Sequence, residues 1–329
     1  MISQVQNSEQ INPAQYINLA DKIKSFALDL GFDLFGIAPA KKSKSSIAYL
    51  KKWLAEGKNA DMKWMKKFPE RRADPQKLLP GAKSIICLAV NYYTLNSPLI
   101  HKDKVRIARY AWCRNYHKII EKRVKLLKRF IKSLAPDAIL KSYVDTGSLL
   151  ERYYAAQAGL GFIGKNTCLI TREFGSYVFL AEIITNLKLP FAKFAGKRSL
   201  SHMGALSCGT CNRCIKACPT EALSAPYAID SRKCIAYLTI ESRGKIPRNL
   251  KSKISPWIFG CDICQEVCPH NIRAKPTKNT DFALAPILKK LTLKQLSAVK
   301  TEEEFKKLLA GTSLIRAKFK GIKNNLMVI

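Results

Sequence analysis

The stretch CGTCNRCIKACP, residues 208–219, contains the strongest motif in this sequence. Its four cysteines follow the spacing C-x2-C-x2-C-x3-C, and Pro219 comes directly after the last of them. This is the spacing of bacterial ferredoxins, in which three thiolates hold one 4Fe–4S cube and the fourth reaches a second cube. The motif therefore predicts a domain that holds two cubes.

A second run, CDICQEVCP at residues 261–269, supplies three more cysteines ahead of a proline. Ile258 stands where this run should have its first cysteine, so one ligand is missing. Cys234, alone between the two runs, can supply it. The crossing rule of ferredoxins then predicts one ligand set of Cys208, Cys211, Cys214 and Cys268, and a second set of Cys218, Cys234, Cys261 and Cys264.

Zinc is the main rival for these cysteines. Structural zinc sites usually pair their ligands as C-x2-C with a distant second pair, and a tight C-x2-C-x2-C triplet fits a cube better. Disulfides are not expected, because the sequence shows no secretory signal. With no apolar stretch near the roughly 18 residues of a membrane helix, we expect a cytoplasmic protein without a membrane partner.

The net charge is the second strong signal. Fifty-seven Lys and Arg against 24 Asp and Glu give +33 over 329 residues. Such an excess indicates a polyanionic partner, with nucleic acid first and a membrane surface second. Residues 102–132 carry twelve basic residues against two acids, and residues 232–253 carry seven against one. A general bias toward lysine in the composition is the alternative explanation.

Apolar periodicity predicts the layout of the first part of the chain. Helices are expected over residues 14–30, in a solvated lysine-rich segment at 41–72, after Tyr116, and over 149–158. Strands are expected in FGIAPA, in the segment that follows Pro80, in ILKSYVD and in YVFLAEIIT. Because strands and helices alternate over residues 1–190, an α/β layered domain is predicted. The tail from Asp281 onward is predicted to be helical.

The glycine run GLGFIG, residues 159–164, matches the dinucleotide pattern G-x-G-x-x-G, and with Lys165 it nearly matches a phosphate loop. Both motifs must follow a strand and open a helix. Here the preceding segment is a predicted helix, and Gly159 is expected to be its C-terminal cap. Both nucleotide-binding interpretations are therefore rejected.

Asp145 ends the predicted strand ILKSYVD, just ahead of a helix. It could be a helix cap. Ser148 and Glu151, however, form the capping-box pattern S-x-x-E, which would leave Asp145 free to face a pocket. Ligands of open α/β sheets gather at the carboxyl ends of strands, so Asp145 is a candidate functional residue.

Three other side chains are given ordinary roles. His117 is expected to make a polar contact near a strand end. Cys113 and Cys168 stand alone in the sequence and are expected to be buried thiols outside the metal sites.

Several longer segments, in order, resemble the epoxyqueuosine reductase family. They are RYAWCRNYH (109–117), VDTGSLLERYYAAQAGLGFIGKN (144–166), EFGSYVFLAEIIT (173–185) and the two cysteine segments. The resemblance covers nearly the whole chain. It departs from the family at Cys113 and Asn115, where the usual AWGRDYH has glycine and aspartate.

The resemblance implies a fold, domains and a function. The expected fold is a nitroreductase-like α/β cobalamin-binding domain (1–195), an α+β ferredoxin-like domain with two 4Fe–4S clusters (196–275) and a short helical, HEAT-like tail (276–329). The implied reaction reduces the epoxide of epoxyqueuosine to queuosine at the wobble position of GUN anticodons, the last step of queuosine biosynthesis. The implied partners are the tRNAs for Asp, Asn, His and Tyr and an external low-potential electron donor, and we expect a monomer.

The resemblance also implies roles for individual residues. Asp145 corresponds to the family's proton donor, and Asp262, next to Cys261, to a cobalamin contact. Arg72, Tyr110, Asn166 and Thr167 fall in segments that line cobalamin in the family. Two-electron reduction with one-electron clusters needs an acceptor that stores charge, which cobalamin supplies. The sequence further suggests that burial beside the corrin raises the pKa of the aspartate toward neutrality.

Two other functions remain open at this point. A corrinoid-dependent reductive dehalogenase would also place cobalamin beside two ferredoxin clusters, but such enzymes are typically exported by a twin-arginine signal. A ferredoxin-like electron carrier joined to an RNA-binding module would hold clusters without cobalamin. A corrinoid titration separates the second alternative from both enzymes.

Overall fold

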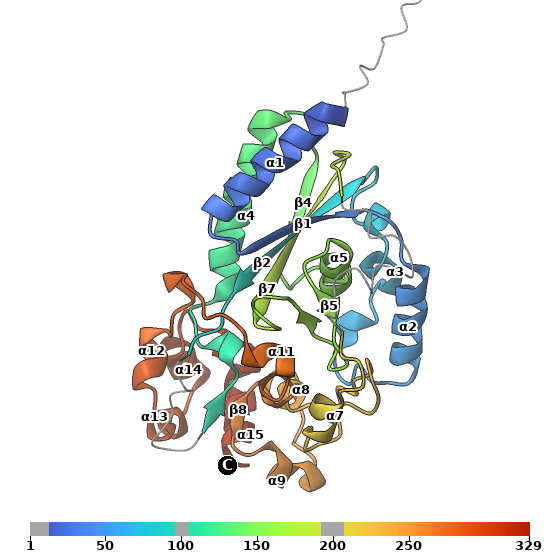
Figure 1. The fold of residues 1–329 in the computed structure, drawn as a ribbon. Helices are drawn as coiled ribbons and strands as arrows, with labels where there is room; N and C mark the ends of the chain where they lie inside the picture. The colour runs from blue at the N-terminus through green and yellow to red at the C-terminus, as the bar shows by residue number, and fades with distance from the viewer. Residues whose placement is uncertain (1–12, 96–104, 192–206) are drawn as a thin grey trace, which may run out of the picture.

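The structure is a computed structural model, and it describes residues 13–95, 105–191 and 207–329 (Figure 1). The predicted boundary between the first two domains, at residues 195 and 196, lies outside the described residues. Among the described residues, no helix is long and apolar enough to cross a membrane.

A four-stranded sheet forms the centre of the first part of the chain, with the strand order β1-β2-β7-β4. All three neighbouring pairs are antiparallel. The strands are β1 (Leu34–Pro39), β2 (Ser84–Asn91), β7 (Val178–Thr185) and β4 (Leu140–Tyr143). Helices do alternate with these strands along the chain, as predicted, but the alternation does not make the strands parallel. The rule for ligand sites of open parallel sheets therefore does not apply to Asp145.

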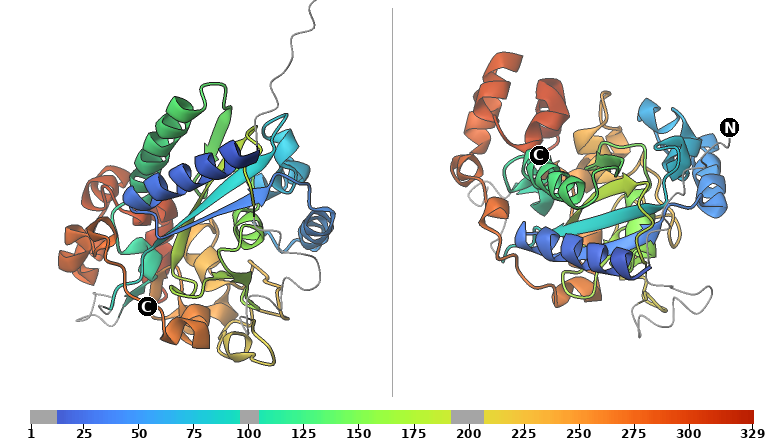
Figure 2. Two further views of the ribbon diagram at one scale, coloured as in Figure 1. Left: turned by 45° about the horizontal axis from the view of Figure 1, so that its top comes forward. Right: turned by 90° about the horizontal axis from the view of Figure 1, so that it is seen from above.

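Two long helices cover one face of this sheet (Figures 1 and 2). They are α1 (Pro13–Asp29) and α4 (Tyr116–Leu134), and both were predicted from apolar periodicity. Residues of α4 from Ile120 to Ile131 pack in the same core as Ile86 and Leu88 of β2. Because side chains alternate along a strand, Cys87 of β2 points to the opposite face of the sheet, where it packs in a second core with Tyr154 and Ala155.

The second face of the sheet is covered by the short helix α5 (Glu151–Gln157), with α2 (Lys44–Ala55) and α3 (Pro69–Arg72) further out (Figure 1). Gly159 follows α5 with a φ of +82° and its N–H bonds the carbonyl of Ala156 at 3.1 Å. The glycine run then enters β5 (Phe162–Ile163), which pairs with β6 (Leu169–Ile170). The run caps a helix and does not open one, which confirms the rejection of both nucleotide motifs.

From residue 207 onward, where the structure describes it, the cysteine region contains short elements around β8 (Trp257–Phe259). The helices are α7 (Arg213–Lys216), α8 (Ile235–Ile240), α9 (Lys251–Ile254), α10 (Ile263–Glu266) and α11 (Pro269–Ile272). Strand β8 pairs in parallel with β3 (Arg106–Ile107), which belongs to the first part of the chain. Ile258 is fully buried in β8, so the position that lacks a cysteine is a core position.

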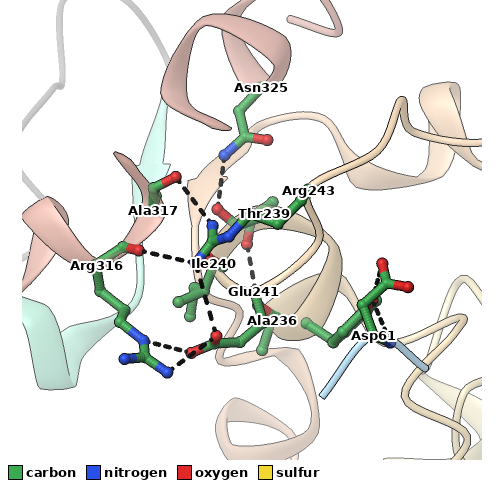
Figure 3. Close-up of polar contacts among 10 residues, drawn as sticks. Asp61, Ala236, Thr239, Ile240, Glu241, Arg243, Arg316, Ala317 and Asn325 are labelled. Atoms are coloured by element: carbon green, nitrogen blue, oxygen red, sulfur yellow. Dashed lines mark hydrogen bonds and ion pairs between the residues drawn. The ribbon is translucent and has the colours of Figure 1, made fainter. Parts of the chain in front are cut away.

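The tail is helical, as predicted, with α12 (Pro286–Lys290), α13 (Leu293–Ala298), α14 (Glu302–Leu308) and α15 (Lys318–Leu326). Figure 3 shows the polar contacts between this tail and the cysteine region. The Asn325 amide donates to the carbonyls of Thr239 and Ile258, both at 2.8 Å, and Arg316 binds the carboxylate of Glu241 at 2.7 and 3.1 Å. These contacts fix the tail against the segment that holds Cys234.

Candidate active site and cluster sites

Asp145 lies two residues beyond β4, in the left-handed backbone region with a φ of +59°. Its Oδ2 accepts a hydrogen bond from the Tyr116 hydroxyl at 2.8 Å and lies 3.7 Å from Nε2 of His117. Nδ1 of His117 contacts the carbonyl of Val144 at 3.2 Å, which is the predicted polar contact near a strand end. The Asp145 side chain remains 63% exposed. The predicted burial of this carboxyl is therefore not provided by the protein chain alone.

The predicted capping box at Ser148 and Glu151 is wrong. Helix α5 has Leu150 as its N-cap, with no side-chain hydrogen bond to the helix. Oε1 of Glu151 instead accepts a hydrogen bond from the backbone N–H of Asp145 at 2.7 Å. The pattern S-x-x-E failed because the loop turns Glu151 back toward the preceding strand, where a free N–H is available.

Four of the predicted cluster cysteines surround one small cavity: Cys208, Cys211, Cys214 and Cys268. Burial is the main cause that raises the pKa of Cys214 and Cys268, and the charge of Cys208 adds to it in both. The backbone N–H of Lys165 points at the sulfur of Cys208, at 3.3 Å. A short N–H contact of this kind stabilises thiolate charge, so the site suits an anionic sulfur ligand.

The other four predicted ligands form a second group. Burial raises the pKa of Cys261 above its ordinary value, and the nearby charges of Cys234 and Cys218 raise it further. The same burial acts on Cys234, the N-cap residue of α8. The charges of Cys261 and Cys234 are in turn among the causes that raise the pKa of Cys264. Cys234 therefore lies near Cys261 and Cys264, although it is distant from them in sequence.

Cys168 lies closer to this second group than was expected. Its sulfur accepts a hydrogen bond from the thiol of Cys264, and this bond lowers the pKa of Cys168. Cys113 is a buried thiol, as predicted. In the described residues, no group of three or more His, Cys, Asp or Glu side chains has the geometry to hold a single metal ion. A cube instead spreads its thiolates over several iron atoms.

Tyr110 lies close to both the cysteine region and Asp145, and its ring is 6.0 Å from the ring of Phe259 in β8. The negative charges of Asp145 and Asp262 both raise the pKa of Tyr110, after burial as the largest cause. The Tyr110 ring lies 6.3 Å from the ring of Tyr116, which holds Asp145. Tyr110 and Asp262 are therefore brought into one neighbourhood with Asp145.

Asp262 is a buried carboxyl in the loop that carries Cys261. It is 1% exposed and accepts a hydrogen bond from the backbone N–H of Arg109 at 2.7 Å. Burial raises its pKa to about 7, against the lowering effect of that hydrogen bond. A carboxyl in this state can serve as a donor or an acceptor near neutral pH.

The remaining predicted cofactor contacts lie on two sides of the site. Asn166 is 3% exposed, and its side chain contacts the carbonyl of Cys264 and the N–H of Cys168 at 3.4 and 3.2 Å. Thr167 has a φ of +66°. Arg72 is 8% exposed, donates to the carbonyl of Trp64 at 3.1 Å, and leaves Nε without a partner in the described residues. Asn166 and Thr167 thus lie by the second cysteine group, whereas Arg72 lies beside Glu151.

Sequence reasoning did not predict a role for three residues near Asp145, namely Tyr116, Arg316 and Glu182. For the first two, the sequence pattern indicates only the start of an amphipathic helix and a helical tail. Arg316 lies close enough to Asp145 and Tyr116 to respond to their charges, and its guanidinium lies 5.5 Å from the ring of Trp64. Glu182 carried a signal that was overlooked, because it is the one acid in the apolar strand segment YVFLAEIIT.

An open groove of about 800 Å³ runs between α4 and β4. Its residues from α4 are mainly basic, and its other end reaches Val144 and Thr146, which flank Asp145. The basic lining residues are Lys125, Lys128, Arg129 and Lys132, with Glu121 as the acidic one. The groove therefore extends a positive surface to the candidate active site.

Comparison with known protein families first defines the class. Residues 207–271 match the model of a 4Fe-4S double cluster binding domain, so this part of the chain belongs to a class of iron–sulfur domains that bind two clusters. Residues 72–146 match the model described as epoxyqueuosine reductase QueG, DUF1730. That segment includes Tyr110, Tyr116 and Asp145.

The relatives identify the family. The epoxyqueuosine reductase of Cellulophaga algicola is 37% identical over 307 residues, which is 93% of this chain and 96% of the relative. That of Gloeobacter violaceus is 41% identical over 312 residues, covering 93% and 94%. A crystal structure of an epoxyqueuosine reductase with an epoxyqueuosine-modified tRNA-Tyr stem loop superimposes with a TM-score of 0.83 at 31% identity, covering 96% of this chain and 81% of that one. The chain belongs to the epoxyqueuosine reductase family.

Proposed function

We propose that this protein reduces the epoxide of epoxyqueuosine in tRNA to give queuosine, with Asp145 as the proton donor. The observation that carries the proposal is the arrangement around Asp145. Its carboxyl is exposed to an incoming substrate, is held by the Tyr116 hydroxyl at 2.8 Å, and shares the neighbourhood of Tyr110 with the cysteine region. The relatives named epoxyqueuosine reductase support the same substrate.

The reaction balances with two electrons and two protons. Both C–O bonds of the epoxide break, a C=C bond forms between the two carbons, and the oxygen leaves as water. A carboxylic acid beside the oxygen supplies a proton as the C–O bond breaks, which typically accelerates such steps about 10²–10⁴-fold. The Asp145 carboxyl is exposed enough to meet an incoming epoxide. Tyr116 orients the carboxyl, since its hydroxyl donates to Oδ2.

We propose two 4Fe–4S clusters with the ligand sets that the crossing rule predicts. Cys208, Cys211, Cys214 and Cys268 would hold the first, and their arrangement around one cavity supports this set. Cys218, Cys234, Cys261 and Cys264 would hold the second, in keeping with the effect of their charges on one another. An external low-potential donor would supply the electrons.

We also propose that cobalamin binds between the second cluster and Asp145. The residues there fit a corrin, whose amide side chains need hydrogen-bond partners. Tyr110, Asn166, Thr167 and Asp262 offer hydroxyl, amide and carboxyl groups, and the unpaired Nε of buried Arg72 offers a further donor. When bound, cobalamin supplies two-electron reducing chemistry, which single cubes do not. Asp262 and Asn166 would also tie it to the loop of Cys261 and Cys264.

We assign the groove between α4 and β4 to the anticodon arm of the tRNA. Phosphates are bound by Lys and Arg with little dependence on sequence, and this groove carries four such side chains. It ends beside Asp145, so an arm that lies in it can present its loop to the carboxyl. The related complex with a tRNA-Tyr stem loop supports an RNA partner. The tRNAs for Asp, Asn, His and Tyr are the proposed substrates, and the cytoplasm is the proposed place of action.

The proposed domains keep the boundaries 1–195, 196–275 and 276–329, with nitroreductase-like, ferredoxin-like and HEAT-like character and a monomeric protein. The parallel pair of β3 and β8 joins the first two of these parts, and the hydrogen bonds of Asn325 join the tail to the second.

The decisive test in cells is the nucleoside content of tRNA. Mass spectrometry of tRNA from a strain that lacks this protein should show accumulated epoxyqueuosine and little queuosine. Restoring the wild-type protein should reverse the ratio. Normal queuosine in the deletion strain would refute the proposed function.

A further inference from the structure

Glu182 is a fully buried acid in the middle of the central sheet. It lies on β7 and pairs with Tyr143 of β4 on one side and Cys87 of β2 on the other. Its exposed fraction is 0%, and it points to the face that α5 covers, where Cys87 also packs. An acid here displaces an apolar side chain from a strand that is otherwise apolar. Burying an ionisable group in this way is costly unless it has a partner.

The partner of Glu182 is another carboxyl group. In the described residues, no N–H or hydroxyl donates to either carboxylate oxygen of Glu182. The carboxyl of Glu151, at the start of α5, lies within hydrogen-bond reach of it. A fully buried carboxyl does not ionise together with a second carboxyl beside it, so the pair of Glu182 and the half-buried Glu151 holds a proton.

The position of that proton follows from the other contact of Glu151. Burial is the largest cause that raises the pKa of Glu151 to about 7, but its Oε1 accepts the backbone N–H of Asp145 at 2.7 Å, which favours the ionised form. Glu182 has no such donor, and burial is the largest cause that raises its pKa well above its ordinary value. Glu182 is therefore the donor of the pair, and Glu151 the acceptor.

We propose that the proton-sharing pair of Glu182 and Glu151 positions Asp145 for catalysis. Glu182 donates to Glu151, and Glu151 holds the backbone N–H of Asp145 in its left-handed conformation. This inference rests on the proposed role of Asp145 as proton donor. Glu151 and Glu182 are positioning residues, since their contacts reach the reaction through Asp145.

The conformation of Asp145 shows why such a hold is needed. A φ of +59° is unfavourable for a residue other than glycine, and it persists only where surrounding contacts enforce it. Two contacts do so in this loop: the Glu151 carboxylate on the N–H and the Tyr116 hydroxyl on the side chain. Loss of the first would release the backbone while leaving the second.

Five other titratable or charged groups lie near the pair of Glu182 and Glu151. Asp145 adds negative charge, Arg152 and Arg72 add positive charge, and the Tyr116 and Cys87 side chains lie within range. Burial and the charge of Glu151 both raise the pKa of the Cys87 thiol and of the Tyr116 phenol, so these two groups stay neutral. As the pH rises, the group that ionises and breaks the hydrogen bond of the pair is therefore Glu182.

Three variants test the proposal in the enzyme loaded with its clusters and cobalamin. E182Q keeps a permanent donor toward Glu151, because its amide N–H replaces the acid proton. E182L fills the same space without a donor, and E151A removes the acceptor for the Asp145 N–H. E173Q is the matched control, since Glu173 is an exposed acid paired with Lys275 at 3.1 Å.

The first readout is hydrogen–deuterium exchange of the peptide 143–150, which needs no turnover. E151A and E182L should exchange about tenfold faster or more, as expected for the loss of a hydrogen bond to a charged group. E182Q and E173Q should match the wild type. If E182L fails to bind its normal iron, E151A alone decides the outcome. Exchange that is unchanged in the folded variants would overturn the proposal, even if the wild type proved inactive on epoxyqueuosine.

The second readout is the rate of epoxide reduction against pH. E182L should lower kcat about tenfold or more, with the KM for the stem loop within about twofold of the wild type. E182Q should keep most of the turnover and hold its rate at alkaline pH, where the wild type declines. A decline in E182Q identical to that of the wild type would show that the shared proton does not control Asp145.

Discussion

The hydroxyl of Tyr116 donates a hydrogen bond to Oδ2 of Asp145 across 2.8 Å, and this contact joins the first turn of α4 to the loop after β4. Burial is the largest cause that raises the pKa of Tyr116 well above its ordinary value, and the charge of Asp145 raises it further. Tyr116 is therefore neutral at every pH at which the enzyme would work. It remains a fixed donor to the carboxyl that we assign as the proton source.

Replacing Tyr116 with Phe should reduce turnover without loss of cofactors. The change removes a hydrogen bond to a charged group, which typically contributes about 1.5–3 kcal/mol, so kcat should fall roughly 10- to 100-fold. Single-turnover reduction of a modified stem loop measures this. Tyr154→Phe is the matched control, because its hydroxyl bonds the carbonyl of Lys41 at 3.0 Å, away from Asp145. Equal rates for the two variants would argue against an orienting role for Tyr116.

The second cluster offers a test of ligand identity by paired cysteine variants. Cys234→Ser should reduce bound iron to roughly half and weaken the broad visible absorption, since one cube loses a thiolate. Cys168→Ser should retain the iron, although the sulfur of Cys168 accepts a hydrogen bond from the thiol of Cys264. Iron analysis after anaerobic reconstitution distinguishes them. The reverse result, with iron lost from the Cys168 variant alone, would move the missing ligand from Cys234 to Cys168.

The buried acid Glu182 should make stability depend on pH. Its pKa is raised in the folded protein, so above about pH 4.3 the folded state binds more protons than the unfolded state. The free energy of unfolding should then fall as pH rises, by up to about 1.4 kcal/mol per pH unit. Glu182→Gln removes this penalty. Its Tm advantage over the wild type should grow between about pH 5 and about pH 8. A constant difference across that range would indicate that Glu182 carries no raised pKa.

The basic groove should govern RNA affinity and its salt dependence. Replacing Lys125, Lys128 and Lys132 together with Ala should weaken stem-loop binding and reduce the salt slope by roughly one for each phosphate that no longer meets a lysine. The rate at saturating RNA should stay close to that of the wild type, because these lysines lie along α4 and away from the reacting atoms. Lys289→Ala on α12 is the control for removal of charge elsewhere. Binding and salt slope unchanged in the triple variant would place the RNA on another surface.

The cysteine spacing predicted much of the metal region because ligand geometry restricts sequence so tightly. Ligand count alone led to the prediction that Cys234 is a ligand, and the structure puts this cysteine near Cys218 and Cys261. Ile258 explains the gap in the motif, since its position is a core position of β8. Helical periodicity likewise located α1 and α4 to within a residue or two.

The surroundings of Asp145 were harder to predict because they depend on contacts between distant segments. The S-x-x-E pattern is local, and it could not show that Glu151 turns back to the N–H of Asp145. The antiparallel order of the sheet is a tertiary property that alternating elements do not determine. Glu182 meets Glu151 only because α5 packs on β7. A single acid in an apolar strand segment therefore does not reveal its partner until the fold is known.

The most direct test of the whole account is the conversion of an epoxyqueuosine-containing tRNA stem loop by the anaerobically reconstituted protein, with mass spectrometry of the nucleosides. The wild type should convert epoxyqueuosine to queuosine. Asp145→Asn, which keeps an oxygen to accept from Tyr116, should bind the same clusters and cobalamin while losing about 100-fold or more of the rate. No conversion by the wild type, or full conversion by Asp145→Asn, would contradict the account.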